Sequence, residues 1–264
     1  MKLPSEINKI WAFAARNLLV NRRNVFAVFE MIFWPGIGIL SVGLLTQFLN
    51  LESEIVTFVL IGAISMNTIQ IAQLDVSYSL LYDVWSKSLK HKFIAPINLS
   101  HVLVGAGLVG LLRGLLVFMV MGLLSMWFFD MDLSRAGPIA LLIFLTGMFL
   151  NAAIIGILVL ALVLRFGHRA EVAAWSFSYL LFLLCGLYYP VTILPAGFRA
   201  MAQLVPLTHF LDYFRHFYGF PLLSPHPLLF GFLQSVVYLF ASYLLLKYTL
   251  QSARKRGTLL KLSE

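Results

Sequence analysis

The chain has 264 residues, of which 61% are hydrophobic and 11% are charged, with a formal net charge of +8 and a mean hydropathy of +0.91. Soluble domains of this size carry about 25% charged residues, so this composition excludes a chain folded in water and leaves the lipid bilayer as its solvent. Only helices and closed barrels can span lipid, because the backbone must satisfy its own hydrogen bonds there. The apolar runs are long and unbroken, which favours helices over the alternating segments of a barrel.

The first segment, residues 5–20, has the pattern of an amphipathic helix. One helical face carries Ile7, Ile10, Trp11, Ala14 and Leu18. This pattern predicts either a helix lying in the membrane interface or a simple anchor that flanks the first span.

Six apolar segments follow, and each is long enough to be a membrane span. They cover residues 25–48, 55–80, 101–128, 138–164, 172–190 and 226–249. The sequence therefore predicts an all-α membrane protein with a single transmembrane domain over residues 1–264. Its parts are an interfacial helix at 1–24, a six-span bundle at 25–249 and a tail at 250–264. Pro35, followed by Gly36, predicts a kink in the first span.

The basic residues predict the orientation of these spans. With the N-terminus inside, Lys and Arg gather in the segments expected on the cytosolic side, and only Arg135, Arg199 and Arg215 fall on the other side. Positively charged loops remain in the cytosol, so both termini are expected to be cytosolic.

The second span contains a polar stripe. Asn67, Gln70, Gln73 and Ser77 fall within about 120° of one another on a helical wheel. Amides facing lipid are unfavourable, so the stripe is expected to form hydrogen bonds between helices or to line a translocation path. Both interpretations remain open from the sequence.

Two charges are expected inside the membrane. Asp75 points roughly opposite to the polar stripe, and Arg113 lies deep in the third span. Intramembrane charges pair with one another or face water, and both residues fall in the inner half of antiparallel spans. We therefore expect a structural ion pair between Asp75 and Arg113.

The segment 81–98 has apolar residues at every fourth position, namely Leu81, Trp85, Leu89 and Phe93. Its other faces carry Asp83, Lys87, Lys90 and His91, and Pro96 is expected to end it. This pattern predicts a short cytosolic amphipathic helix that either lies on lipid or docks a soluble partner.

The segment 191–225 is too apolar for a free loop and is interrupted by prolines. We expect short helices that dip into the outer leaflet, where protein or water covers the irregular backbone. Its aromatic residues favour an interface belt, with stacking on sugar rings as the alternative.

No catalytic motif stands out. The sequence lacks a G-x-x-x-x-G-K-[ST] loop and an H-E-x-x-H motif. On a helix His209, Asp212 and His216 share a face that could hold a metal or an acid–base pair. The simpler interpretation is a polar face in which Asp212 pairs with Arg215 or His216.

The order of these parts resembles the type-2 permeases of ATP-binding-cassette exporters. The resemblance covers nearly the whole chain, and its most specific part follows the fifth apolar segment. The family's aromatic, proline and arginine positions fall there on Gly186, Tyr188, Tyr189, Pro190, Leu194, Pro195, Pro206, Leu207, Thr208 and Arg215.

This resemblance implies a transport subunit without catalytic activity of its own. It implies two permeases, most simply a homodimer, around a central path, and two copies of an ABC ATPase subunit that use ATP and Mg. It also implies that the segment 81–98 couples the ATPase to the spans, with coupling candidates Leu81, Trp85, Lys87, Leu89, Lys90 and Phe93. The outer re-entrant helices would include Tyr188, Tyr189, Pro190, Pro195, Pro206 and Arg215.

The expected location is a bacterial or archaeal inner membrane, with lipid but no nucleic acid as a further partner and no cofactor or metal bound by this chain. The expected substrate is an amphiphile or a glycan, moved outward. Alternatives are an efflux permease for drugs or antibiotics in the same family, a membrane-embedded enzyme acting on lipids or glycans, and an anchor subunit without a path.

Overall fold

The structure is a computed structural model that describes residues 3–23, 25–85, 97–166 and 171–255. These residues form helices and connections without any strand, which confirms the predicted all-α class. In chain order the elements are α1 (Leu3–Arg23), α2 (Val25–Phe48), α3 (Ser53–Trp85), α5 (Leu99–Phe129), η1 (Leu133–Ala136), α6 (Gly137–Phe166), α7 (Glu171–Leu184), η3 (Val191–Ile193), α8 (Ala196–Gln203), α9 (Pro206–His216) and α10 (Pro227–Lys255).

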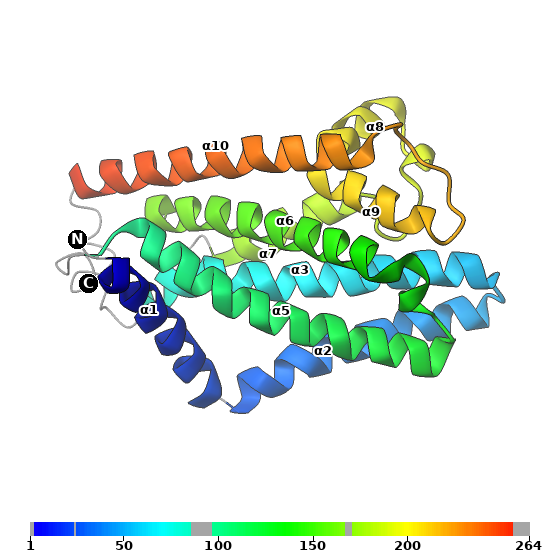
Figure 1. Cartoon of the computed structure of the whole chain (residues 1–264), viewed down its shortest axis with the longest axis horizontal. Coiled ribbons are helices and arrows are strands. Elements are labelled where there is room, and N and C mark those ends of the chain that lie inside the picture. The colour runs from blue at the N-terminus through cyan, green and yellow to red at the C-terminus, as the bar shows by residue number, and fades with distance from the viewer. Residues whose placement is uncertain (1–2, 24, 86–96, 167–170, 256–264) are drawn as a thin grey trace.

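Five helices in the described part of the chain are long and apolar enough to cross a membrane: α2, α3, α5, α6 and α10. They coincide with five of the six predicted spans and extend several of them by a few residues. The first residues of α1 and the last residues of α10 lie at one end of the bundle, and α8 and α9 lie at the other end (Figure 1).

The remaining predicted span, 172–190, is shorter than expected. Helix α7 has 14 residues and ends at Leu184, so it is about 21 Å long, whereas a span needs about 20 residues. The chain turns immediately afterwards, because Gly186 adopts a φ of 69° that favours glycine. The predicted boundary at residue 190 is therefore wrong, and the described residues show five full-length spans.

Helices α3 and α6 form the centre of the bundle. In their most apolar stretches 61% of the residues of α3 and 72% of those of α6 are buried, against 22% in α2 and 17% in α10. Helix α3 packs against α2, α5 and α6, while α10 covers α6 and α9. Close approach of α5 to α3 depends on Gly110, because a Cβ added at this position would lie 2.5 Å from the carbonyl oxygen of Ala72.

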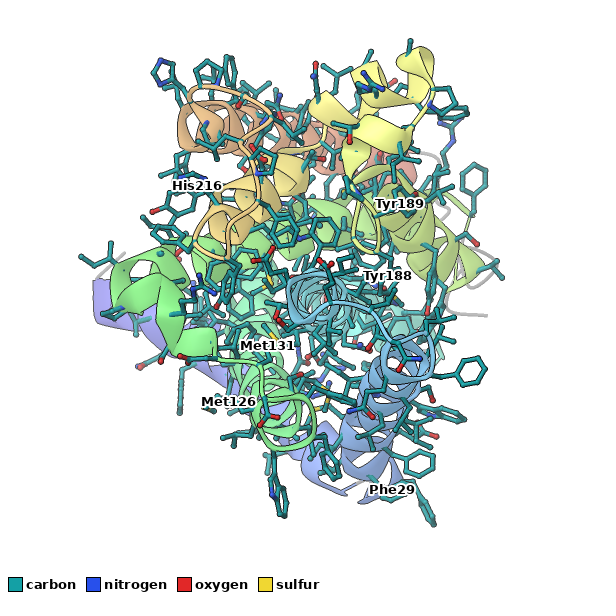
Figure 2. All side chains as sticks on the ribbon, turned by 90° about the vertical axis from the view of Figure 1, so that its right-hand side faces the viewer. Phe29, Met126, Met131, Tyr188, Tyr189 and His216 are labelled. Atoms are coloured by element: carbon teal, nitrogen blue, oxygen red, sulfur yellow. The ribbon has the colours of Figure 1, made fainter. Side chains whose placement is uncertain are left out.

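The segment after α7 caps this bundle with short helices. Phe214 of α9 stacks on Phe144 of α6 with ring centroids 4.1 Å apart, and Phe210 is fully buried nearby. Seen from this end, Tyr188 lies near the centre of the bundle beside α3, whereas Phe29 points outward at its rim (Figure 2). The segment 191–225 thus contains the short helices η3, α8 and α9, and their depth in the membrane stays a prediction.

The predicted helix at 81–98 starts differently from expected. Helix α3 runs without a break to Trp85, and Leu81 is fully buried in the bundle core. The first five residues therefore belong to α3, and Leu81 is not on an exposed docking face. The coupling candidates Lys87, Leu89, Lys90 and Phe93 lie outside the described residues.

Candidate functional site

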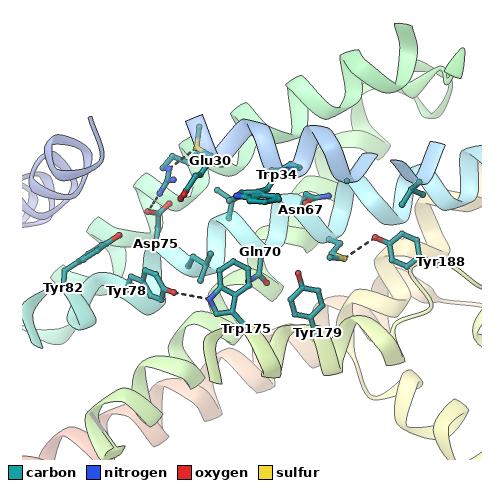
Figure 3. Close-up of a pocket in the computed structure, with 18 residues that line it drawn as sticks. Glu30, Trp34, Asn67, Gln70, Asp75, Tyr78, Tyr82, Trp175, Tyr179 and Tyr188 are labelled. Atoms are coloured by element: carbon teal, nitrogen blue, oxygen red, sulfur yellow. Dashed lines mark hydrogen bonds and ion pairs between the residues drawn. The ribbon is translucent and has the colours of Figure 1, made fainter. Parts of the chain in front are cut away.

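The main candidate site is a cavity of about 650 Å³ on the face of α3 between α2 and α7 (Figure 3). Helix α3 contributes Met66, Asn67, Gln70, Ile71, Leu74, Asp75, Tyr78 and Tyr82. These positions recur at helical spacing, so one continuous face of α3 forms the floor. Helices α2 and α7 supply the two walls, and α5 adds Arg113.

The predicted polar stripe on α3 divides into two parts. Asn67 and Gln70 line the cavity. Gln73 and Ser77 are fully buried away from it, and the Ser77 hydroxyl donates to the Gln73 backbone and side-chain oxygens at 2.9 Å. The bonds between Ser77 and Gln73 lie within α3, so both interpretations of the stripe stay predictions. Asn67 and Gln70 face the cavity, and Gln73 and Ser77 are buried in the helix packing.

Gln70 is notable because its amide is buried without a partner. Its side chain is 6% exposed, and neither Nε2 nor Oε1 has a hydrogen-bond partner among the described residues. Buried polar groups are nearly always hydrogen-bonded. An unsatisfied amide on a cavity wall therefore marks a place where a bound molecule or water completes the bonding.

An ion pair lies at one end of the cavity. Arg113 Nη1 donates to Asp75 Oδ1 at 2.6 Å, and Arg113 Nε contacts Met31 Sδ at 3.1 Å. These are the two charges for which the sequence predicts pairing. Asp75 nevertheless lines the same cavity as Asn67 and Gln70, because the cavity extends around α3 beyond the polar stripe.

Aromatic side chains form much of the remaining lining. Trp175 Nε1 of α7 donates to the Tyr78 hydroxyl at 3.2 Å, which links α7 to α3. The Tyr188 hydroxyl contacts Met66 Sδ at 3.3 Å. Further lining residues are Trp34 of α2, Tyr179 of α7 and Tyr82 of α3. Large amphipathic rings give the cavity an apolar surface with a few polar tips.

Sequence reasoning missed several of these residues. Glu30, Trp34, Trp175 and Tyr179 all line the cavity. Glu30 could have been noticed as a lone carboxylate in the apolar segment 25–48, and Trp175 and Tyr179 share a helical face at a spacing of four. Neither signal indicates that α2 and α7 face each other across α3.

Arg215 joins the cap of short helices that follows α7 to the bundle. It is 5% exposed, and its guanidinium donates to the carbonyl oxygens of Gly186 at 2.8 Å, Leu187 at 2.6 Å and Phe58 at 3.1 Å. Its Cζ also lies 3.4 Å from the centroid of the Phe58 ring. Because these acceptors belong to α3 and to the turn after α7, Arg215 fixes α9 against both.

The other residues of the predicted outer region lie mainly at helix starts. Pro190 and Pro195 precede η3 and α8, and Pro206 is the first residue of α9. Proline suits these positions because the first helical N–H groups have no partner within the helix. The Tyr189 hydroxyl donates to the carbonyl oxygen of Leu183 at the end of α7.

The hypothetical metal or acid–base cluster on α9 is wrong. His209 Nε2 bonds to the Gln203 carbonyl oxygen at 2.9 Å, and both carboxylate oxygens of Asp212 accept from Leu223 N at 3.0 Å. His216 Nδ1 lies 3.2 Å from a backbone oxygen. No group of metal-ligating side chains occurs in the part of the chain that was described. Asp212 therefore fixes a loop instead of pairing with a neighbouring cation on α9.

At the opposite end, α1 is tied to the bundle by an ion pair and a hydrogen bond. Arg16 pairs with the buried Asp83 of α3, and Glu6 lies 2.6 Å from His101 of α5. Lys9 also donates to Glu6 at 2.9 Å. The hydrogen bond from Lys9 is the main reason that the pKa of the Glu6 carboxyl lies below its ordinary value; desolvation opposes it, and the hydrogen bond with His101 adds to the lowering. These contacts attach α1 beside the Trp85 end of α3.

Comparison with known proteins identifies the family. The family model of the ABC-2 type transporters matches residues 8–218. The chain belongs to this family. An inner membrane transport permease, YadH of Escherichia coli K12, is 28% identical over 199 residues, which cover 75% of each chain. An uncharacterized protein of Archaeoglobus fulgidus is 46% identical over 50 residues, or 19% of this chain and 78% of that protein.

The family assignment confirms the predicted resemblance and describes a multi-pass membrane transport permease. The match extends from α1 to the end of α9. It therefore includes every residue that lines the cavity and the Arg215 contacts, while α10 lies beyond it.

Proposed function

We propose that this ABC-2 family member is the permease subunit of an ATP-driven exporter that moves an amphiphilic or glycan-type substrate outward. The observation that carries the proposal is the aromatic cavity on α3, which is large enough for a small ligand and lies among membrane helices. Efflux of a drug or antibiotic is the second candidate, and the apolar aromatic walls favour it.

The energy source is a separate protein. The sequence has no phosphate-binding loop, and ABC-2 permeases work with ABC ATPase partners. We propose two ATPase copies on the cytosolic side, with both termini of this chain on that same side as the basic residues predict. The inner membrane is the proposed location, as the name of the YadH relative supports.

Helix α3 supplies a mechanical connection between cavity and ATPase. It is one helix from the cavity floor to Trp85, immediately before the predicted coupling residues. The ion pair between Arg16 and Asp83 attaches α1 to the same end. A push on residues 86–96 would then move α3 and α1 together and change the width of the cavity.

A second permease completes the path in this proposal. The described cavity is open on the side between α2 and α7, where Trp34 is 64% and Trp175 is 43% exposed. Large exposed aromatics beside a cavity suit either lipid or a facing subunit. We propose a homodimer in which two such cavities face one another. We also propose that α7, together with the residues that flank it, crosses the membrane as a sixth span.

The test is substrate-stimulated ATP hydrolysis by the complex captured from native membranes through a tag on this chain. Amphiphiles, glycolipids and cationic and neutral drugs are added as a panel. The proposal predicts that one class raises the rate of ATP hydrolysis. Hydrolysis that none of these compounds alters, in a complex that also fails to move them across proteoliposome membranes, would contradict it.

Leu89→Pro tests the coupling part of the proposal. Proline removes a helical hydrogen bond and breaks a helix, so this variant is expected to insert normally but to lose substrate-stimulated ATP hydrolysis. Leu222→Pro is the matched control, because Leu222 lies in an exposed non-helical connection before α10. Normal stimulation in the Leu89→Pro complex would refute the coupling role.

A further inference from the structure

The charges in the cavity lining are unequal. Glu30, Asp75 and Arg113 are the charged residues among the described ones that line it. Arg113 is already engaged by Asp75 and by Met31 Sδ. Glu30 is exposed and has no ion-pair or hydrogen-bond partner within the described chain. The lining therefore has a formal charge of about −1 at neutral pH, because two carboxylates face one guanidinium.

Figure 3 shows Glu30 and Asp75 toward the same end of the cavity, with Trp34, Trp175 and Tyr179 along its length. Aromatic ring faces carry negative potential and attract cations, most strongly for Trp and Tyr when the site is desolvated. The carboxylates and the ring faces therefore favour the same sign of charge on a ligand.

The unpartnered amide of Gln70 adds a second indication of a ligand. Gln70 lies in the middle of the cavity floor, and its side chain is almost completely buried. Its amide can accept from or donate to a polar group on a bound molecule. A polar group on a bound molecule or a water carried beside it would satisfy this amide.

We propose that the cavity selects cationic amphiphiles, with the positive charge beside Glu30 and the apolar body between Trp34 and Trp175. An anionic molecule such as a lipid-linked phosphate would meet the Glu30 carboxylate, and Arg113, the one cation among the described lining residues, is held by Asp75. This inference rests on the proposed function, because it assumes that the substrate passes through the cavity. It narrows the substrate class to cationic molecules.

The test uses two probes of nearly equal size and opposite charge, tetraphenylphosphonium and tetraphenylborate. Binding of each radiolabelled probe to the full chain in lipid nanodiscs is measured by equilibrium dialysis, with empty nanodiscs subtracted. We expect the cation to bind at least tenfold more tightly than the anion to the protein. Equal binding, or tighter binding of the anion, would overturn the proposal.

Variants at Glu30 locate the selectivity. Glu30→Gln keeps the shape and removes the charge, and we expect it to weaken binding of the cation about tenfold, equivalent to about 1.4 kcal/mol. Glu30→Lys is expected to reverse the preference toward tetraphenylborate. Glu54→Gln is the matched control, because Glu54 is exposed in the first turn of α3 and does not line the cavity.

Unchanged cation binding in Glu30→Gln would refute the role of Glu30. If Glu30→Lys does not fold, the wild-type preference and Glu30→Gln decide the question. Failure of this inference is distinct from failure of the proposed function. A complex that hydrolyses ATP in response to an anionic substrate would refute only the charge selectivity. Selective cation binding by a chain that has no ATPase partner would refute only the exporter.

Discussion

Replacing Arg215 by methionine tests whether the cap of short helices that follows α7 is held by one side chain. The substitution keeps an unbranched apolar stem of similar length and removes the guanidinium. Three carbonyl oxygens, on Phe58, Gly186 and Leu187, then lose a donor in a buried site.

The expected cost follows from two opposing effects. A buried acceptor left without a partner costs about 1–3 kcal/mol. The Phe58 carbonyl lies inside α3 and keeps its helical hydrogen bond, so its loss of Arg215 is expected to cost little. The carbonyls of Gly186 and Leu187 are counted fully, at about 1.5 kcal/mol each, which gives a cost of about 3 kcal/mol. Removal of a buried charge also relieves a desolvation penalty. We expect the lost hydrogen bonds to outweigh it, because the Arg215 guanidinium lies within 3.1 Å of all three acceptors.

The assay is thermal unfolding of the purified chain in detergent, followed by size-exclusion chromatography. A loss of about 3 kcal/mol corresponds to a fall in Tm of roughly 6–12 °C for a chain of this size. Arg199→Met is the matched control. Arg199 also donates to backbone carbonyls, but it does so on the exposed surface of α8, and we expect a change within about 2 °C because surface substitutions cost little.

An unchanged or higher Tm in Arg215→Met would refute this reasoning. It would mean that the desolvation penalty of the guanidinium exceeds the value of its bonds. A fall of similar size in Arg199→Met would show that the assay reports general loss of charge instead of the buried contacts.

Two further predictions concern the contact of α3 with α5. Asp75→Asn and Arg113→Gln should each lower the folded yield, because removing one partner leaves the other charge buried. The double neutral variant should recover part of the yield. Additive losses in a double-mutant cycle would argue against the pair. Gly110→Ala should lower Tm, because the added Cβ would lie 2.5 Å from a backbone oxygen of α3, whereas Gly107→Ala on the same helix meets nothing within 4 Å and should be neutral or slightly stabilising. Equal thermal shifts in these two glycine variants would contradict the predicted close approach.

The helices could be predicted from the sequence wherever a long apolar run sufficed. The five long membrane helices coincide with predicted segments because run length alone identifies a span. The end of α7 was misplaced because residues 185–190 are as apolar as a helix, while the φ of Gly186 that ends it is a conformational property. The break expected at residue 81 was absent because Leu81 continues the buried face of α3.

The cavity could be predicted only in part, because it is formed by helices far apart in the chain. The position of Asn67 and Gln70 on an inward face follows from polarity and helical period. Asp75 shares the floor because the cavity covers a wider arc of α3 than the amide stripe does. Glu30 and Trp175 face this floor through packing of α2 and α7 on α3, and no local pattern in the sequence contains that information.

Capture of this chain from native membranes through an affinity tag, with the masses and molar ratio of its partners determined, tests the central claim most directly. The account predicts one dominant partner that contains a G-x-x-x-x-G-K-[ST] loop, in equal copy number with this chain. A chain that is recovered without any nucleotide-binding protein, yet moves substrate on its own in proteoliposomes, would contradict it.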